Sequence, residues 1–259
     1  PYPPFITSTL QLDASNKLGF SPSKTMSLAQ KLYEGINING ENKGLITYMR
    51  TDSTNLSNQF IQEAKNIIVK NFGDNYVYNS VRTFKNKVKN SQEAHEAIRP
   101  SDPSIKPNEL PSSLEQDLKK LYDLIWRRSL STQASQSVSK IISIKVANKS
   151  NSIILTASTS ELQFDGYKKI YQDEEINNED KNKDIVKLNK ETLIKKIETE
   201  NKQHFTEPPP RYSEASLIKK LEEYGIGRPS TYANIMKKNQ LRGYVTLNSK
   251  RFFPQPSGR

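Results

Sequence analysis

Apolar side chains recur every three or four residues in two segments of the first half of the chain, a spacing that predicts amphipathic helices. One segment follows Ser57, a residue type that caps helix N-termini, and ends at Gly73. The other begins near Ser112 or Ser113. The apolar positions are Phe60, Ile61, Ala64, Ile67 and Ile68 in the first segment and Leu114, Leu118, Leu121, Tyr122 and Ile125 in the second. With a third helix expected over residues 24–35, residues 1–135 are predicted to be mostly helical.

The pattern changes to β-type runs in the next part of the chain. Residues 141–146 and 153–156 are rich in isoleucine and are separated by a polar, turn-like stretch. Residues 164–167 predict another turn followed by a strand, and residues 185–197 indicate two further strands. A charged, Asn-rich stretch between them predicts a loop. We therefore expect residues 136–207 to form an antiparallel β segment.

The last part of the chain, residues 208–259, predicts two helices and a hairpin after a proline-rich joint. Ser213 is placed to cap the first helix and Gly225 to end it. The second helix is expected to start at Arg228-Pro229-Ser230-Thr231, and the hairpin pairs residues 243–247 with 251–253. This order is typical of an incomplete winged-helix-like, DNA-binding segment. The fold class is thus expected to be multidomain α+β.

The composition limits the kinds of partner and of metal site that the chain can have. The chain of 259 residues carries a formal net charge of +11, which indicates a polyanionic partner such as nucleic acid or a membrane surface. No apolar run approaches the roughly 20 residues needed to span a bilayer. Cysteine is absent, which excludes disulfides and thiolate metal sites. The chain starts without Met, so we expect it to be an internal piece of a longer protein.

The strongest candidate chemistry lies at Tyr48-Met49-Arg50, in a polar loop that follows an apolar segment. A phenol can attack a phosphodiester while a guanidinium fork holds the phosphate oxygens bidentately. Because free tyrosine has a pKa of about 10, such a nucleophile needs positive charge nearby. The alternative is a tyrosine at a strand end beside a surface arginine.

The residues around this loop resemble the bacterial type IA DNA topoisomerases over most of the chain, with a loose match only from about 140 to 205. The blocks that carry the resemblance occur in the family's order: Pro4-Phe5-Ile6-Thr7-Ser8-Thr9-Leu10-Gln11, Ala29-Gln30-Lys31-Leu32-Tyr33-Glu34, Gly44-Leu45-Ile46-Thr47-Tyr48-Met49-Arg50-Thr51-Asp52-Ser53-Thr54-Asn55, Ala94-His95-Glu96-Ala97-Ile98-Arg99-Pro100 and Gly225-Ile226-Gly227-Arg228-Pro229-Ser230-Thr231-Tyr232. The resemblance implies that residues 1–135 are a helical gate domain and that Tyr48 becomes bound to a 5′ phosphate of one DNA strand.

The resemblance also implies roles for the other site residues. Arg50 would contact the scissile phosphate, although it has the alternative of pairing with Asp52. His95 would lie near the tyrosine and assist cleavage. Arg99 either binds phosphate or forms an ion pair with Glu93 or Glu96, and the sequence leaves both open. Further DNA contacts are expected, by resemblance or by residue type, from Lys24, Gln30, Arg228, Thr231 and Arg242.

Family membership would make the chain a fragment of an isomerase that relaxes negative supercoils without ATP, by cleaving, passing and resealing single strands. No metal or cofactor site is expected in this fragment, because the family binds Mg²⁺ on a preceding Toprim domain. The expected partners are single-stranded DNA and the rest of the same polypeptide, not a membrane, and the expected location is the bacterial cytoplasm at the nucleoid. Without the Toprim domain we expect the fragment to be inactive.

Two other readings compete with this one. A non-enzymatic basic module that binds single strands would explain the charge but would leave Tyr48 without chemistry. Tyrosine recombinases also combine Tyr, Arg and His. They typically show His-x-x-Arg and a tyrosine near the C-terminus, whereas here the spacing is His95-x-x-x-Arg99 and Tyr48 lies early.

Overall fold

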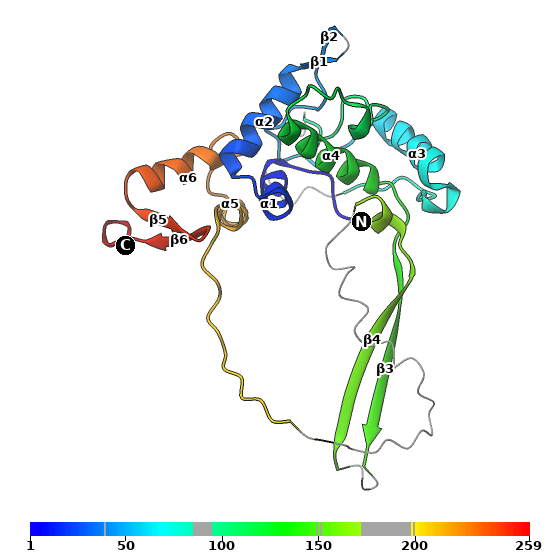
Figure 1. Ribbon diagram of the computed structural model, residues 1–259, viewed down its shortest axis with the longest axis vertical. Helices are drawn as coiled ribbons and strands as arrows, with labels where there is room; N and C mark the ends of the chain where they lie inside the picture. The colour runs from blue at the N-terminus through cyan, green and yellow to red at the C-terminus, as the bar shows by residue number, and fades with distance from the viewer. Residues whose placement is uncertain (39, 85–94, 149, 151, 172–197, 199) are drawn as a thin grey trace. The chain divides into compact units, whose positions relative to one another are not determined.

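The computed structural model describes residues 1–38, 40–84, 95–148, 150, 152–171, 198 and 200–259. Within them the fold is α+β, with six α-helices and three two-stranded antiparallel sheets (Figure 1). The chain divides into two compact units: residues 1–135 together with 210–259, and residues 136–209. No helix in the described part is both long and apolar enough to cross a lipid bilayer.

The first unit contains all six helices and two of the hairpins. Its helices are α1 (Thr7–Leu18), α2 (Pro22–Glu34), α3 (Asn58–Phe72), α4 (Gln116–Ser131), α5 (Glu214–Glu223) and α6 (Tyr232–Leu241), with short 3-10 helices at Asp74–Tyr76, Pro107–Glu109 and Pro256–Gly258. Its strands are β1 (Ile36–Ile38) paired with β2 (Glu41–Lys43), and β5 (Val245–Asn248) paired with β6 (Arg251–Pro254).

The three helices expected in the first half are confirmed, with one boundary displaced. The Ser57 hydroxyl accepts the Phe60 N–H at the start of α3, and Gly73 ends that helix with φ at 98°. Helix α4 begins at Gln116 rather than at Ser112 or Ser113, so the predicted start was wrong. The residues before it form a turn in which the Leu114 N–H donates to the Pro111 carbonyl, which leaves the serines outside the helix.

Helix α1 and the β1–β2 hairpin are additional elements that the hydrophobic pattern did not reveal. The buried face of α1 carries Thr7, Ser8 and Gln11 beside Leu10 and Ala14. Because three of the five buried side chains on that face are polar, the sequence shows no clear apolar period there. The strands of the hairpin are three residues long, too short for alternation to be recognised.

The C-terminal helices and hairpin are also confirmed, again with one corrected boundary. The Ser213 hydroxyl accepts the Ser216 N–H and caps α5 as expected. Helix α6 begins at Tyr232, not at Arg228, because residues before it form a turn in which the Thr231 N–H donates to the Arg228 carbonyl. A small core joins these elements through Ile218, Tyr232, Met236 and Phe252.

The second unit is a long antiparallel hairpin. Strand β3 (Val138–Ala147) pairs with β4 (Ile154–Phe164), which confirms and extends the two predicted runs. The strand expected after Gly166 is wrong: Gly166–Lys169 form a 3-10 helix in which the Ile170 and Tyr171 N–H groups both donate to the Tyr167 carbonyl. The loop and the two further strands expected over residues 172–197 lie outside the described residues.

The core of the first unit surrounds α4, whose buried polar groups have partners in the preceding loop. The Tyr122 hydroxyl donates to the Ile105 carbonyl at 2.8 Å, and the Trp126 indole N–H donates to the Pro103 carbonyl at 2.9 Å. Burial raises the pKa of Tyr122 above its ordinary value, and the charge of Asp102 adds to this. The loop over residues 102–105 is therefore fixed by side chains of the helix.

Three extended segments lie beside one another at the centre of this unit. Phe5 forms a β-bridge with Ile98, and Ile46 forms one with Pro100. The Ser101 N–H donates to the Leu45 carbonyl at 2.9 Å. The loop that begins after Ile46 is thus anchored to the segment around residue 98 and not to a strand of its own.

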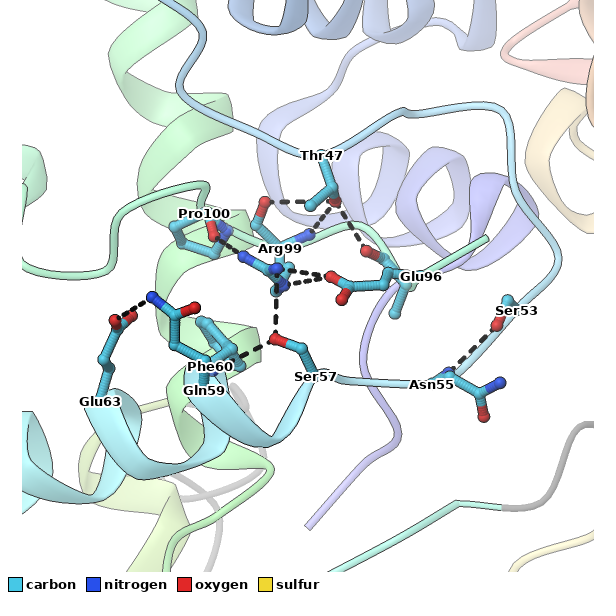
Figure 2. A network of polar contacts seen from close by, with 11 residues as sticks. Thr47, Ser53, Asn55, Ser57, Gln59, Phe60, Glu63, Glu96, Arg99 and Pro100 are labelled. Atoms are coloured by element: carbon cyan, nitrogen blue, oxygen red, sulfur yellow. Dashed lines mark hydrogen bonds and ion pairs between the residues drawn. The ribbon is translucent and has the colours of Figure 1, made fainter. Parts of the chain in front are cut away.

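A buried arginine stabilises this junction (Figure 2). The Arg99 side chain is 13% exposed, pairs with Glu96 at 2.5 Å and donates to the Pro100 carbonyl at 2.8 Å. Its guanidinium lies 4.9 Å from the centre of the Phe60 ring on α3. Of the two alternatives for Arg99, the ion pair with Glu96 is present in the structure; Glu93 lies outside the described residues.

Replacing Tyr122 by phenylalanine should lower the free energy of unfolding by about 1 kcal/mol, because a hydrogen bond in a well-packed site is lost. Chemical denaturation of Tyr122→Phe measures this. Tyr212→Phe is the matched control, since Tyr212 is 45% exposed and its hydroxyl makes no hydrogen bond within the described residues. Equal stability of both variants would contradict the role given to the Tyr122 hydroxyl.

The Glu96–Arg99 pair should show a coupling of about 1 kcal/mol or more in a double-mutant cycle of unfolding with alanine, because the guanidinium is largely desolvated and has several acceptors. The control cycle is Asp123 with Arg127, an exposed pair on α4 at 2.8 Å. That pair should give less than about 0.5 kcal/mol. Similar values for both cycles would mean that Arg99 has no special structural role.

Candidate active site

The Tyr48 loop is fixed on both sides by threonine hydroxyls. Before the tyrosine, the Thr47 hydroxyl donates to the Ala97 carbonyl at 2.7 Å and accepts the Arg99 N–H at 3.0 Å. After it, the Thr7 hydroxyl accepts the Thr51 N–H at 3.0 Å and donates to the Met49 carbonyl at 2.8 Å. The Thr7 N–H also donates to the Thr51 carbonyl. The start of α1 therefore determines where the loop lies.

Burial alternates along this loop. Met49 is 1% exposed and anchors the loop in the core, whereas Tyr48 is 36% exposed and Arg50 is also exposed. Tyr48 and Arg50 therefore face solvent together.

Two aromatic rings flank Tyr48. The Tyr33 ring, at the end of α2, meets it edge-on with 5.4 Å between ring centres. The His95 ring lies 5.7 Å away at an angle of 32°. The backbone after His95 is held by the Ala97 N–H, which donates to the Asn55 carbonyl at 2.8 Å. The phenol is thus positioned from three segments of the chain.

Tyr48 opens into a cavity of about 700 Å³. Its lining comes from α2, the Tyr48 loop, His95 and the turn before α6: Tyr33, Tyr48, Arg50, Thr51, Asp52, His95, Arg228, Pro229 and Ser230. The turn depends on Gly227, whose φ is 81° and at which a Cβ atom would lie 3.0 Å from Ile235. A side chain there would be strained in backbone and crowded by its neighbours.

The cavity has the charge expected of a phosphate site. Arg50 and Arg228 both line it, and neither guanidinium makes a hydrogen bond or ion pair with another described residue. The alternative of an Arg50–Asp52 ion pair is therefore not what the structure contains in its described part. Both guanidinium groups therefore have N–H donors available to an anion.

A second layer of titratable groups lies next to the cavity. Burial raises the pKa of Glu222, and the negative charge of Asp52 adds to this, while a hydrogen bond from Ser8 opposes it. Burial also raises the pKa of Tyr232 to about 12, with Glu222 and Asp52 raising it further and Arg228 lowering it. Asp52, Glu222, Tyr232 and Arg228 are thus close enough to influence one another.

Four of the nine predicted site residues line the cavity: Tyr48, Arg50, His95 and Arg228. The others have different surroundings. The Thr231 hydroxyl accepts the Arg228 N–H at 2.8 Å, so it shapes the turn, and Arg99 is in the network of Figure 2. Lys24 pairs with Asp117 at 2.5 Å, Gln30 donates to Glu34 on the same helix, and Arg242 is exposed at the end of α6. DNA contacts by these residues remain a prediction.

Sequence reasoning missed Tyr33 and Ser230 as site residues and gave Asp52 only the role of pairing with Arg50. In the structure Tyr33 is distinguished by its exposure, since this large aromatic side chain stays 41% exposed at the end of α2. Exposure itself cannot be read from the sequence. Ser230 lies within the block that gave Arg228, and nothing in the pattern distinguished it.

The described residues contain no group of three or more His, Asp or Glu side chains arranged to hold a metal ion. Among the residues that line the cavity, Asp52 is the one carboxylate. Magnesium prefers several oxygen ligands in octahedral geometry, so this donor set does not fit it.

The chain matches proteins described as DNA topoisomerases in both sequence and structure. A family model described as DNA topoisomerase matches residues 1–259. DNA topoisomerase 1 of Rickettsia bellii is 51% identical over 261 residues, covering 100% of this chain and 32% of that protein. DNA topoisomerase 1 of Campylobacter jejuni is 45% identical, covering 98% of this chain and 35% of that protein. Full-length topoisomerase I from Thermotoga maritima matches in structure with a TM-score of 0.78 and 37% identity, covering 100% of this chain and 41% of that one.

The chain thus spans about a third of the length of the curated relatives it matches. The match extends over the whole chain and includes every segment that lines the cavity. The chain belongs to the DNA topoisomerase family, as a part related to bacterial DNA topoisomerase 1.

Proposed function

We propose that this chain is the tyrosine-bearing part of a type IA topoisomerase that cleaves and reseals single DNA strands through Tyr48. The observation that carries the proposal is the convergence of Tyr48, Arg50, His95 and Arg228 on one cavity. Arg228 lies 180 positions after Tyr48 in the sequence. The cavity thus brings together a phenol, an imidazole and two guanidinium groups that have no partner among the described residues. These are groups that phosphoryl transfer needs.

In the proposed reaction, the Tyr48 oxygen attacks a backbone phosphorus. A bond forms between the phenolic oxygen and phosphorus, and the bond from phosphorus to the 3′ oxygen breaks. The phenol gives up its proton as it attacks, and the leaving 3′ oxygen takes up a proton, so the number of protons is unchanged. The 5′ phosphate stays on Tyr48. Attack by that 3′ hydroxyl reverses the step and reseals the strand. One phosphodiester replaces another, so ATP is not consumed.

The cavity residues have distinct proposed roles. Arg50 and Arg228 hold the phosphate oxygens and stabilise the charge that develops in the transition state, an effect worth several kcal/mol for a single preorganised donor. His95, with its ring centre 5.7 Å from that of Tyr48, is assigned to proton transfer. Helices α5 and α6 with the β5–β6 hairpin are proposed to act as a winged-helix-like segment that grips the strand.

The remainder of the polypeptide is the proposed partner for catalysis. The relatives are about three times as long as this chain, which leaves room for a Toprim domain that binds Mg²⁺. Supercoil relaxation belongs to the assembled protein, and the isolated chain is proposed to be inactive. The proposed location is the nucleoid in a bacterial cytoplasm, where the proposed DNA substrate lies.

The isolated chain should bind single-stranded DNA with an affinity that falls steeply as salt increases, because each phosphate contact releases counterions. Arg50→Ala should weaken binding by about 1–2 kcal/mol, as expected for losing a charge-assisted contact. Fluorescence anisotropy with a labelled oligonucleotide measures this. Arg127→Ala removes the same charge from the exposed face of α4 and should have a much smaller effect. Equal losses would place the DNA elsewhere.

Mixing the chain with a separately produced N-terminal part, Mg²⁺ and a labelled oligonucleotide should yield a covalent protein–DNA adduct. Tyr48→Phe should abolish it, because phenylalanine has no nucleophilic oxygen, while the control Tyr212→Phe should retain it. Denaturing gel electrophoresis detects the adduct. An adduct that survives Tyr48→Phe would refute the assignment. Binding without an adduct in any mixture would favour the non-enzymatic single-strand-binding module.

A further inference from the structure

One hydrogen bond joins segments separated by 214 residues and lies next to the cavity. The Ser8 hydroxyl, in the first turn of α1, donates to the Glu222 carboxylate at 2.7 Å. Glu222 is in the last turn of α5, and α1 and α5 pack against each other (Figure 1). Ser8 is 2% exposed, so this contact is shielded from solvent on the α1 side.

The first turn of α1 binds both the Tyr48 loop and the C-terminal segment that carries Arg228. Thr7 binds the backbone of the Tyr48 loop through its hydroxyl and its N–H. The next residue, Ser8, binds Glu222. Two adjacent residues therefore connect the nucleophile's loop to the C-terminal segment.

A hydrogen-bonded turn leads from Glu222 to Arg228. The Ile226 N–H donates to the Leu221 carbonyl at 2.8 Å, and the Arg228 N–H donates to the Thr231 hydroxyl at 2.8 Å. The intervening Gly225 and Gly227 have φ values of 69° and 81°. With the backbone fixed in this way, the position of Glu222 determines the position of Arg228.

We propose that Glu222 is a positioning residue that, through Ser8, docks the Arg228 turn beside Tyr48. The catalytic part of this inference rests on the function proposed above. Glu222 does not line the cavity and acts through Arg228.

The chemistry of the contact makes docking depend on pH. Facing Glu222 are Asp52 from the Tyr48 loop, Lys219 and Glu223 on its own helix, and Tyr232 of α6, with Arg228 close to Tyr232. The raised pKa of Glu222 means that the docked state favours the protonated carboxyl. Docking is therefore strongest at low pH and weakens as pH rises from the ordinary glutamate pKa towards the raised one.

Distances between spin labels test docking without relying on DNA chemistry. The chain has no cysteine, so labels can be attached at Asn16→Cys on α1 and Lys237→Cys on α6, both exposed positions. The parent protein should give a narrow distance distribution that broadens as the pH rises above the ordinary glutamate pKa of about 4.3. Glu222→Gln, whose amide oxygen still accepts from Ser8 and cannot ionise, should stay narrow throughout.

Glu222→Ala should give a broad distribution at every pH, and Glu223→Gln is the matched control. Glu223 is exposed and pairs with Lys220 at 3.0 Å, so neutralising it should leave the distances and their pH dependence nearly unchanged. If Glu222→Ala unfolds the chain, Ser8→Ala tests the same bond and should broaden the distribution most at high pH. A narrow, pH-independent distribution in all variants would overturn the proposal.

The reconstituted adduct assay then tests the catalytic consequence. Glu222→Ala should slow adduct formation by about tenfold or more, through misplacement of Arg228, and Glu222→Gln should restore the rate. An unchanged rate with Glu222→Ala would overturn the positioning role. If the parent protein forms no adduct, the proposed function fails, whereas the label distances still decide whether Glu222 docks the turn.

Discussion

The site depends on how a loop without a partner strand satisfies its buried backbone groups. A buried N–H or C=O that lacks a partner costs about as much as a hydrogen bond, so segments of this kind need side-chain partners. After Tyr48, the Thr7 hydroxyl supplies them at Met49 and Thr51; before it, the Thr47 hydroxyl fastens the loop to the backbone of Ala97 and Arg99. Met49 is held in the core between these anchors, and this leaves Tyr48 and Arg50 on the solvent side. The exposure of the phenol thus follows from where two hydroxyls lie.

A cavity lined by unpaired cations has an electrostatic cost that the fold must offset. Arg50 and Arg228 face the same space without carboxylate partners among the described residues, whereas Arg99 and Arg128 are paired with Glu96 and Asp13. The paired arginines lie in or near the core, where their side chains are 13% and 8% exposed. The arginines that stabilise the fold have their acceptors within the chain, whereas the guanidinium groups at the cavity keep their N–H donors available.

Much of this could be predicted from the sequence, for identifiable reasons. Helix α3 has an apolar face, a serine cap and a terminal glycine, so local rules were sufficient. Helix α1 was not predicted because Thr7, Ser8 and Gln11 share its buried face. The hydrogen bonds of Thr7 and Ser8 depend on residues far away in the chain. The start of α6 was misplaced because Pro229 suits the first turn of a helix, while the hydroxyl of Thr231 closes a turn there instead.

The site could be predicted in part for the same reasons. Motifs identified Tyr48, Arg50, His95 and Arg228, whose meeting in one cavity then required the tertiary structure. They did not separate the roles of Arg99, because an arginine that binds phosphate and one that binds a carboxylate look alike in sequence. The contact of Glu222 with Ser8 could not be predicted either, because the sequence does not show which residue each glutamate of an amphipathic helix faces.

The first unit is built from two stretches of chain, residues 1–135 and 210–259, and this has a consequence for biosynthesis. Helix α1 cannot acquire its α5 neighbour until the ribosome has added roughly two hundred residues, at about 5–20 residues per second. Contacts with so large a sequence separation slow folding, since a long loop must close before they form. Many seconds therefore pass before α5 can reach α1, and the cationic cavity, which needs the turn at Arg228, is completed late in the folding of this unit.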